Sequence, residues 1–199
     1  MIAGIGEGSD GQRMPDNLTR TSSPLTGPFV NRILSALLLR REIYEQAAAD
    51  PNALSQAAAI VCLSAISQPS ALIDAFGAWG MVVIMLIGLI RWYLFVAIVY
   101  PIGRLIAWKP VPFRPLLRCL GFAEAPALLS LARFVLGNTL PDWYRLLLWL
   151  WLLAANVVAV RAALRISLPR AIGVGVCSFV LYLLAPPLIE ALILSATSP

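Results

Sequence analysis

Histidine is absent from this chain of 199 residues, and only 10 residues are acidic. The usual general base and the commonest metal ligand are therefore missing, which excludes Ser-His-Asp and Cys-His catalytic arrangements. The three cysteines, Cys62, Cys119 and Cys177, form no CxxC pair, so a zinc ribbon or a thiol redox motif is excluded. HExxH, GxSxG, Walker and dinucleotide-binding patterns are also missing. We expect a protein that is not an enzyme and that holds no cofactor.

Charge is scarce as well. Charged residues make up 13% of the chain, whereas soluble domains carry about a quarter. Hydrophobic residues make up 60%, a composition typical of an integral membrane protein. The net charge of +5 comes from arginines placed between long apolar runs rather than gathered in one basic domain. This pattern sets membrane orientation and does not predict nucleic-acid binding.

The first 49 residues contain no long apolar run. Residues 1–28 are rich in Gly, Ser and Pro and cannot bury enough apolar area to offset ordering, so we expect a disordered cytosolic tail. Residues 29–49 carry apolar side chains at helical spacing, which predicts one amphipathic helix in the membrane interface. Its arginines, Arg32, Arg40 and Arg41, would lie near anionic headgroups. Packing of this helix against the protein's own spans is compatible with the same pattern.

Five apolar runs within residues 50–195 approach the roughly 20 residues that a helix needs to cross a bilayer. Gln56, Gln68 and Pro69 interrupt the first run, and the fourth is the strongest. We therefore predict an all-α, polytopic membrane protein, a five-span helical bundle preceded by the amphipathic interfacial helix. The runs are 54–73, 81–103, 116–136, 143–164 and 171–194.

The basic residues predict the orientation of these spans. If the amino terminus is cytosolic, all of the 15 basic residues except Arg91, Arg133 and Arg145 face the cytosol. Cytosolic loops carry an excess of Lys and Arg, and the opposite orientation would invert the ratio. We therefore expect a cytoplasmic amino terminus and a carboxyl terminus on the outside.

The stretch "GRLIAWKPVPFRPLLRCLGFAEAPALL" contains an ordered Arg-x-x-Gly-Phe-x-x-x-Pro after a span that ends in Gly-Arg. With "VVAVRAALRISLPRAIGV" between the last two runs, it resembles the Yip family of Ypt/Rab-interacting membrane proteins in its short bacterial form. The resemblance extends from about Phe29 to Leu194. Arg91 departs from it, because a small or apolar residue is expected there. The family motif falls on Arg118, Gly121, Phe122 and Pro126.

The resemblance implies a five-span bundle with a cytosolic amino terminus, in the bacterial inner membrane. Eukaryotic members are linked to vesicle traffic, membrane shaping and binding of small GTPases, but a bacterial chain would not meet a Rab-type partner. We expect a non-enzymatic protein that organises membrane or recruits partners. Those partners are the lipid bilayer with its anionic headgroups, and membrane proteins or a second copy of the chain. The alternative is a small transporter or channel subunit that uses intramembrane charged residues.

Five polar residues fall inside the predicted spans. Intramembrane charges are costly and mark functional sites, or they are paired groups that hold helices together. For the arginine in the second span we consider three roles: sliding to the outer interface, bonding to a partner at mid-membrane, or lining a permeation path. An amide can bond across helices. The five residues are Arg91, Glu124, Asn156, Arg161 and Glu190.

The third run holds two helix-weakening residues. Gly121 lacks a side chain and Pro126 removes a backbone bond, so we predict a kink or a restart at this point. At 1.5 Å per residue, Glu124 and Arg161 lie at similar depths, roughly 9 Å and 6 Å inside the cytosolic boundary. We therefore predict a Glu124–Arg161 pair that clamps the third and fourth spans.

Reporter fusions test the predicted orientation. Compartment-specific reporters should be active in the cytosol at three positions and on the far side at three others, because the basic loops stay inside. A cytosolic carboxyl terminus would contradict five spans and would indicate that the first run does not cross. The cytosolic positions are residue 20, Lys109 and Ser167, and the far-side positions are Ala78, Asn138 and Ser198.

Overall fold

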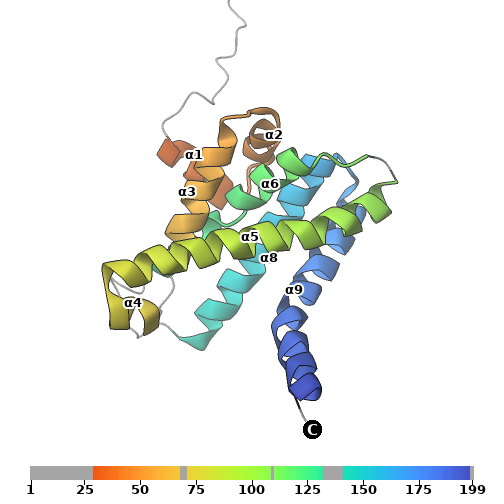
Figure 1. Ribbon diagram of the computed structural model, residues 1–199. Coiled ribbons are helices and arrows are strands. Elements are labelled where there is room, and N and C mark those ends of the chain that lie inside the picture. The colour runs from red at the N-terminus through yellow and green to blue at the C-terminus, as the bar shows by residue number, and fades with distance from the viewer. Residues whose placement is uncertain (1–28, 68–70, 109, 132–140, 198–199) are drawn as a thin grey trace, which may run out of the picture.

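The computed structural model describes residues 29–67, 71–108, 110–131 and 141–197, and within these ranges it places no side chain for 71, 142 and 183–197. All regular secondary structure in these ranges is helical, which confirms the all-α class. The predicted tail, residues 1–28, lies outside the described residues. The elements are α1 (Phe29–Leu37), α2 (Arg41–Ala49), α3 (Ala53–Ile66), α4 (Ala71–Phe76), α5 (Ala78–Ala107), α6 (Phe113–Phe122), the 3₁₀ helix η1 (Ala125–Leu131), α8 (Asp142–Leu164) and α9 (Leu168–Thr197) (Figure 1).

Within the part of the chain that the structure describes with side chains, two helices, α5 and α8, are long and apolar enough to cross a membrane. The 30 residues of α5 extend about 45 Å, against a hydrocarbon thickness of about 30 Å. The rest of the described chain buries only 22% of the most apolar window of α5 and 39% of that of α8. Most of their apolar surface therefore faces outward, which suits a bilayer and does not suit the core of a soluble protein.

The first and third predicted runs form shorter or divided elements, whereas the fifth lies on α9, a helix of 30 residues. The 14 residues of α3 extend about 21 Å, less than the hydrocarbon thickness. The run at 116–136 is divided between α6 and η1 by a turn at Ala123 and Glu124, which confirms the predicted interruption. Pro126 lies in the first turn of η1, where a missing N–H is tolerated. Among the described residues, two helices could thus span a membrane, and five spans stay a prediction.

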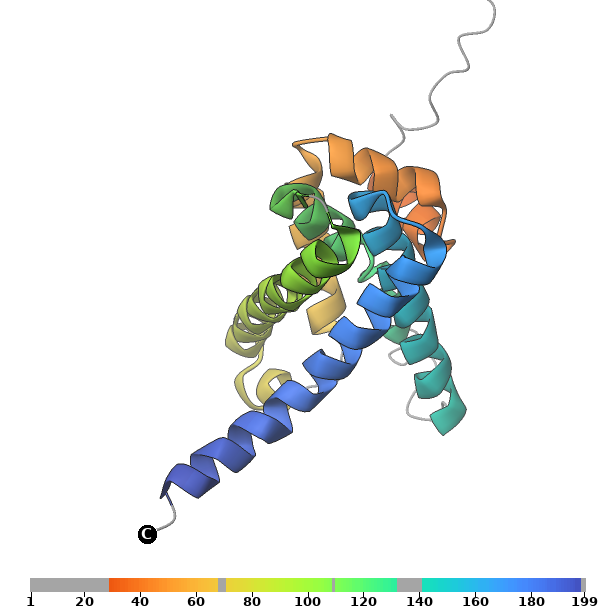
Figure 2. The same ribbon diagram turned by 90° about the vertical axis from the view of Figure 1, so that its right-hand side faces the viewer.

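Several helices lie together at one end of the molecule. In Figure 1, α1 and α2 lie near the start of α3 and near α6, whereas α4 lies at the far end of α5. Figure 2 shows α9 extending beyond the other helices toward the carboxyl terminus. A Cβ on Gly103 would lie 2.8 Å from Leu164 Cδ1, so the carboxyl ends of α5 and α8 meet. We name the region of α1, α2, the ends of α5 and α8 and the starts of α6 and α9 the basic end.

The predicted single helix over residues 29–49 is wrong. The chain divides it into α1 and α2, and Leu39 between them has a left-handed φ of +55°. Tyr44 of α2 is fully buried, and its hydroxyl donates to the Ala36 carbonyl at 3.1 Å. Burial also raises the pKa of the Tyr44 phenol. The second half of the predicted helix, α2, therefore packs against the rest of the protein, which was the alternative to an interfacial position.

Three described residues other than glycine adopt the left-handed conformation, and all lie at the basic end. Leu39 follows α1, Trp108 ends α5 at φ +53°, and Arg165 ends α8 at φ +50°. Glycine is the usual residue at such helix ends, because a Cβ costs about 1–2 kcal/mol there. Three neighbouring helix ends therefore each carry this backbone strain.

The ends of α3 and η1 meet at two buried serines. Ser67 Oγ lies 2.7 Å from Ser130 Oγ and 3.1 Å from the Ala127 carbonyl oxygen. Ser130 Oγ lies 3.2 Å from the carbonyl oxygen of Ser67. Carbonyl groups at these helix ends thus find partners inside the protein rather than in water or lipid.

Gly121 lies where α6, α3 and α5 touch, and we predict that its small size is required for stability. A Cβ there would lie 2.6 Å from Ala57 Cβ and 3.0 Å from Trp92 Cζ2. Gly121→Ala should therefore lower the free energy of unfolding by about 1–3 kcal/mol, because the overlap forces helices apart. Gly173→Ala is the matched control, since nothing lies within 4 Å of its Cβ.

Unfolding of both variants is followed by circular dichroism in detergent. The control should be neutral or should gain up to about 1 kcal/mol of helix propensity. Equal stability of the two variants would show that the close contact at Gly121 is not required.

Candidate functional site

A cavity of about 340 Å³ lies among α3, α5, α8, α9 and the turn after α6. Three of the five polar residues singled out in the sequence line it: Arg91, Glu124 and Asn156. Most of the remaining wall is apolar or aromatic, and its size is at the lower end of that of small-molecule pockets. The aromatic part of the wall consists of Trp92, Phe95, Trp149, Phe179 and Tyr182.

Arg91 lies in the interior part of α5 rather than at its ends. Trp79 and Trp108 are 77% and 89% exposed at the two ends of this helix, where tryptophan suits a membrane interface. At 1.5 Å per residue, Arg91 lies about 18 Å from Trp79 and about 26 Å from Trp108 along the axis. The sliding alternative stays a prediction, because the roughly 26 Å from Arg91 to Trp108 fits a hydrocarbon thickness of about 30 Å when Arg91 lies at the outer interface.

Arg91 has a bonded partner in α9. Its Nε donates to the Tyr182 hydroxyl at 2.6 Å, and its guanidinium carbon lies 5.6 Å from the centre of the ring. The Tyr182 ring packs edge-on against Phe95, with centroids 5.3 Å apart. Aromatic packing thus fixes the tyrosine, and the tyrosine fixes one side of the guanidinium. The sequence reasoning missed Tyr182, although a hydroxyl within an apolar run was a usable signal.

Glu124 occupies the turn between α6 and η1. Its backbone N–H donates to the Gly121 carbonyl at 3.2 Å, and its carbonyl accepts from the Ala127 N–H at 2.9 Å. The side chain lines the cavity, as does that of Arg91. The turn therefore presents a carboxylate to the same space that the arginine enters from α5.

The predicted Glu124–Arg161 pair is wrong. Among the residues that the structure describes, neither side chain forms an ion pair within 4.0 Å. Arg161 is half-buried in the last turn of α8 and does not line the cavity. The prediction treated the chain from Arg118 to Glu124 as one continuous helix. The helix ends at Phe122, so the direction of the Glu124 side chain does not follow from its distance from Arg118 along the sequence.

Asn156 does not bond across helices as expected. Its Nδ2 donates to the Leu152 carbonyl of the same helix at 2.8 Å. Its Oδ1 is buried, as is the Trp92 Nε1, and neither atom has a hydrogen-bond partner among the described residues. An unmade buried hydrogen bond costs about 1–3 kcal/mol. Two residues of the cavity wall therefore each have one buried polar atom that could still form a hydrogen bond. Glu190 lies in the part of α9 whose side chains are outside the described residues.

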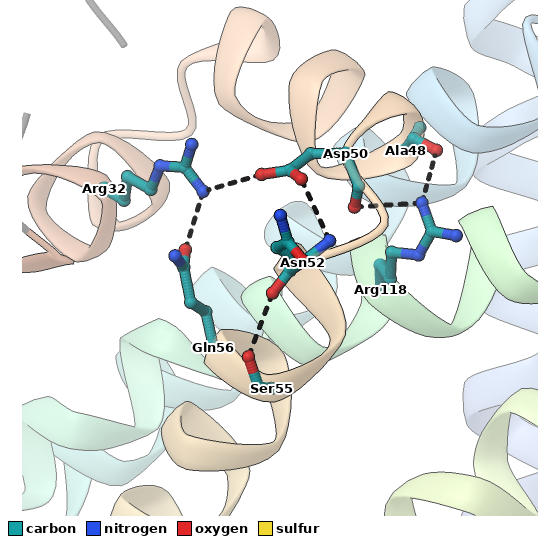
Figure 3. Close-up of polar contacts among 7 residues, drawn as sticks. All are labelled: Arg32, Ala48, Asp50, Asn52, Ser55, Gln56 and Arg118. Carbon is teal, nitrogen blue, oxygen red and sulfur yellow. Dashed lines mark hydrogen bonds and ion pairs between the residues drawn. The ribbon is translucent and has the colours of Figure 1, made fainter. Parts of the chain in front are cut away.

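A second polar cluster ties the basic end together (Figure 3). Arg118 Nη1 donates to the carbonyl oxygens of Ala48 and Asp50, each at 3.0 Å. Arg32 Nη1 donates to Asp50 Oδ2 at 3.3 Å and to Gln56 Oε1 at 2.7 Å. These bonds join α1, the α2–α3 turn and α6. Gln56, which interrupts the first apolar run, thus serves this cluster.

The outer surface of α1 is apolar next to exposed arginines. Val30, Leu34 and Leu38 recur every four residues and are 60%, 51% and 64% exposed, and we call them the α1 row. Arg40 and Arg41 follow after Leu39 and are exposed, with Arg41 Nε 2.6 Å from Glu45 Oε1. On the inner side, Trp151 of α8 donates from Nε1 to the Leu37 carbonyl at 3.0 Å. The bundle holds the inner face of α1 and leaves the α1 row uncovered by the described chain.

We predict that Glu124 is coupled to Arg91 and not to Arg161. Glu124→Gln and Arg91→Gln should show non-additive losses in the free energy of unfolding, by more than about 0.5 kcal/mol. The reason is that the first substitution leaves a charge uncompensated and the second removes that charge. Glu124→Gln with Arg161→Gln is the matched control and should add within about 0.5 kcal/mol.

Thermal unfolding of the single and double variants in detergent measures both couplings. Additive losses for Glu124 with Arg91 would contradict the electrostatic contact across the cavity. A non-additive result for Arg161 would restore the clamp between the third and fourth runs.

Comparison with known proteins assigns no role to the cavity or to the basic end. No protein family, curated protein or solved structure matches the chain. The resemblance to the Yip family therefore stays a prediction.

Proposed function

We propose that the chain is a non-enzymatic integral membrane protein of the Yip type, located in the bacterial inner membrane. In this proposal, the basic end lies at the cytosolic surface, where it organises the membrane or recruits membrane-protein partners. The α1 row beside Arg40 and Arg41 carries the proposal. Apolar side chains next to cations suit the boundary between acyl chains and anionic headgroups.

The distribution of arginines supports this orientation. The basic end carries exposed arginines on α2, α5, α6 and α9, including Arg104, Arg114 and Arg170. The opposite end of α8 carries exposed Arg145 next to Trp143, which is 63% exposed and suits the outer interface. Cytosolic loops hold the excess of basic residues in membrane proteins, so the basic end belongs on the cytosolic side.

We predict that the α1 row is immersed in the headgroup region. The test uses the full chain in nanodiscs, with the three cysteines replaced by alanine and a fluorescent label at position 34 or 42. Lipids carrying a quencher should quench the label at Leu34 several-fold more than the label at Glu42, because Leu34 belongs to the α1 row. Glu42 is a matched control, since it is exposed at the same end on α2.

Charge is tested in the same experiment. Replacing Arg40 and Arg41 with Gln should reduce quenching at position 34 in anionic nanodiscs but not in neutral ones, because each arginine near an anionic surface contributes about 1 kcal/mol. Equal quenching at positions 34 and 42 would show that α1 is not an interfacial helix and would remove the basis of the proposal.

The cavity favours a second candidate, a small transporter or channel subunit. Arg91 and Glu124 line one cavity from two elements, and transporters bind their substrates at polar groups between helices. Flux of a solute through reconstituted vesicles, abolished by Glu124→Gln in a protein that still folds, would favour this candidate over the first.

A further inference from the structure

The cavity holds a cation and an anion that do not bond to each other. Arg91 and Glu124 both line it, yet no N–O distance of 4.0 Å or less joins them. Tyr182 occupies Nε of the guanidinium, and its two terminal nitrogens have no hydrogen-bond partner among the described residues. The Glu124 carboxylate likewise accepts no hydrogen bond from the described side chains. The two terminal nitrogens of Arg91 and the Glu124 carboxylate are therefore available to whatever enters the cavity.

Charges in a low-dielectric region must be compensated, because an isolated charge inside a membrane is costly. A singly charged ligand would compensate either Arg91 or Glu124 and leave the other, and an uncharged ligand would compensate neither. A molecule that carries both signs meets both groups at once. The geometry of two opposed, unjoined charges thus selects for a ligand with two charges of opposite sign.

We propose that this cavity binds a small zwitterion, with its carboxylate on Arg91 and its ammonium group on Glu124. The free terminal nitrogens of a guanidinium match the two oxygens of a carboxylate, and such charge-assisted bonds are the strongest available to a side chain. The ammonium group meets the Glu124 carboxylate and the faces of nearby aromatic rings.

The rest of the wall defines the body of the ligand. Trp149 and Phe179 pack edge-on with centroids 5.6 Å apart, and with Trp92 and Phe95 they surround the cavity with aromatic surface. A volume of about 340 Å³ suits a small metabolite and is too small for a phospholipid with two acyl chains. The ligand class is therefore an amino acid with an apolar or aromatic side chain. This inference rests on the membrane setting of the proposed function, but on neither α1 nor the orientation.

The test uses the full chain, purified in detergent, with radiolabelled L-phenylalanine as the probe. Saturable binding is expected, with competition by L-leucine. Two analogues that each lack one charge, 3-phenylpropionate and phenethylamine, should compete about tenfold less well or worse, because each leaves either Arg91 or Glu124 without a partner of opposite charge. Competition by 3-phenylpropionate as strong as that by L-phenylalanine would overturn the proposal in favour of a simple anion site.

Variants assign the binding to the cavity. Glu124→Gln should weaken L-phenylalanine binding about tenfold or more, while binding of 3-phenylpropionate should not fall, since its carboxylate needs only Arg91. Arg161→Gln is the matched control, because this arginine does not line the cavity, and should bind L-phenylalanine normally. If Glu124→Gln does not fold, the analogue series on the unchanged protein decides. Absence of saturable binding of both amino acids at millimolar concentration would overturn the proposal.

Discussion

A bilayer offers no water to backbone groups, so a helix that ends within it must bond its free carbonyl groups to the protein itself. Ser67 and Ser130 supply bonds of this kind for α3 and η1, because each hydroxyl reaches a carbonyl of the other element. Two short elements can therefore stop inside the bundle. The cavity lies where they stop, between α3, the turn after α6 and the long helices α5, α8 and α9.

Small residues support the same region. A Cβ on Gly88 would lie 2.7 Å from Ala65 Cβ, and a Cβ on Gly175 would lie 2.8 Å from Val157 Cγ2. These contacts bring α3 against α5 and α8 against α9, on two sides of the cavity. In membranes, close approach of this kind substitutes for the hydrophobic driving force that water supplies to soluble proteins. The polar groups of the cavity are thus held between helix pairs whose spacing allows little movement.

The sequence predicted features that depend on composition and local signals. The all-α class and the two helices long and apolar enough to span a membrane followed from apolar length, and the interruption before η1 followed from Pro126. Features that depend on helix rotation could not be predicted. Counting residues measures depth but not direction, so Glu124 was assigned to Arg161 although it shares the cavity with Arg91. The break at Leu39 was also hidden, because no glycine or proline marks it.

The break at Leu39 is one of three helix ends where a residue other than glycine adopts the left-handed conformation. At Leu39, Trp108 and Arg165, glycine would relieve backbone strain, but it would also remove an aliphatic, an aromatic and a cationic side chain from one end of the molecule. Trp108 is almost fully exposed, so its indole contributes little to the packing of the bundle. At these three positions the chain is less stable than it would be with glycine, but it keeps three side chains at this end of the molecule. Replacing these three residues with glycine would produce a more stable protein that interacts less strongly with its surroundings through this end of the molecule.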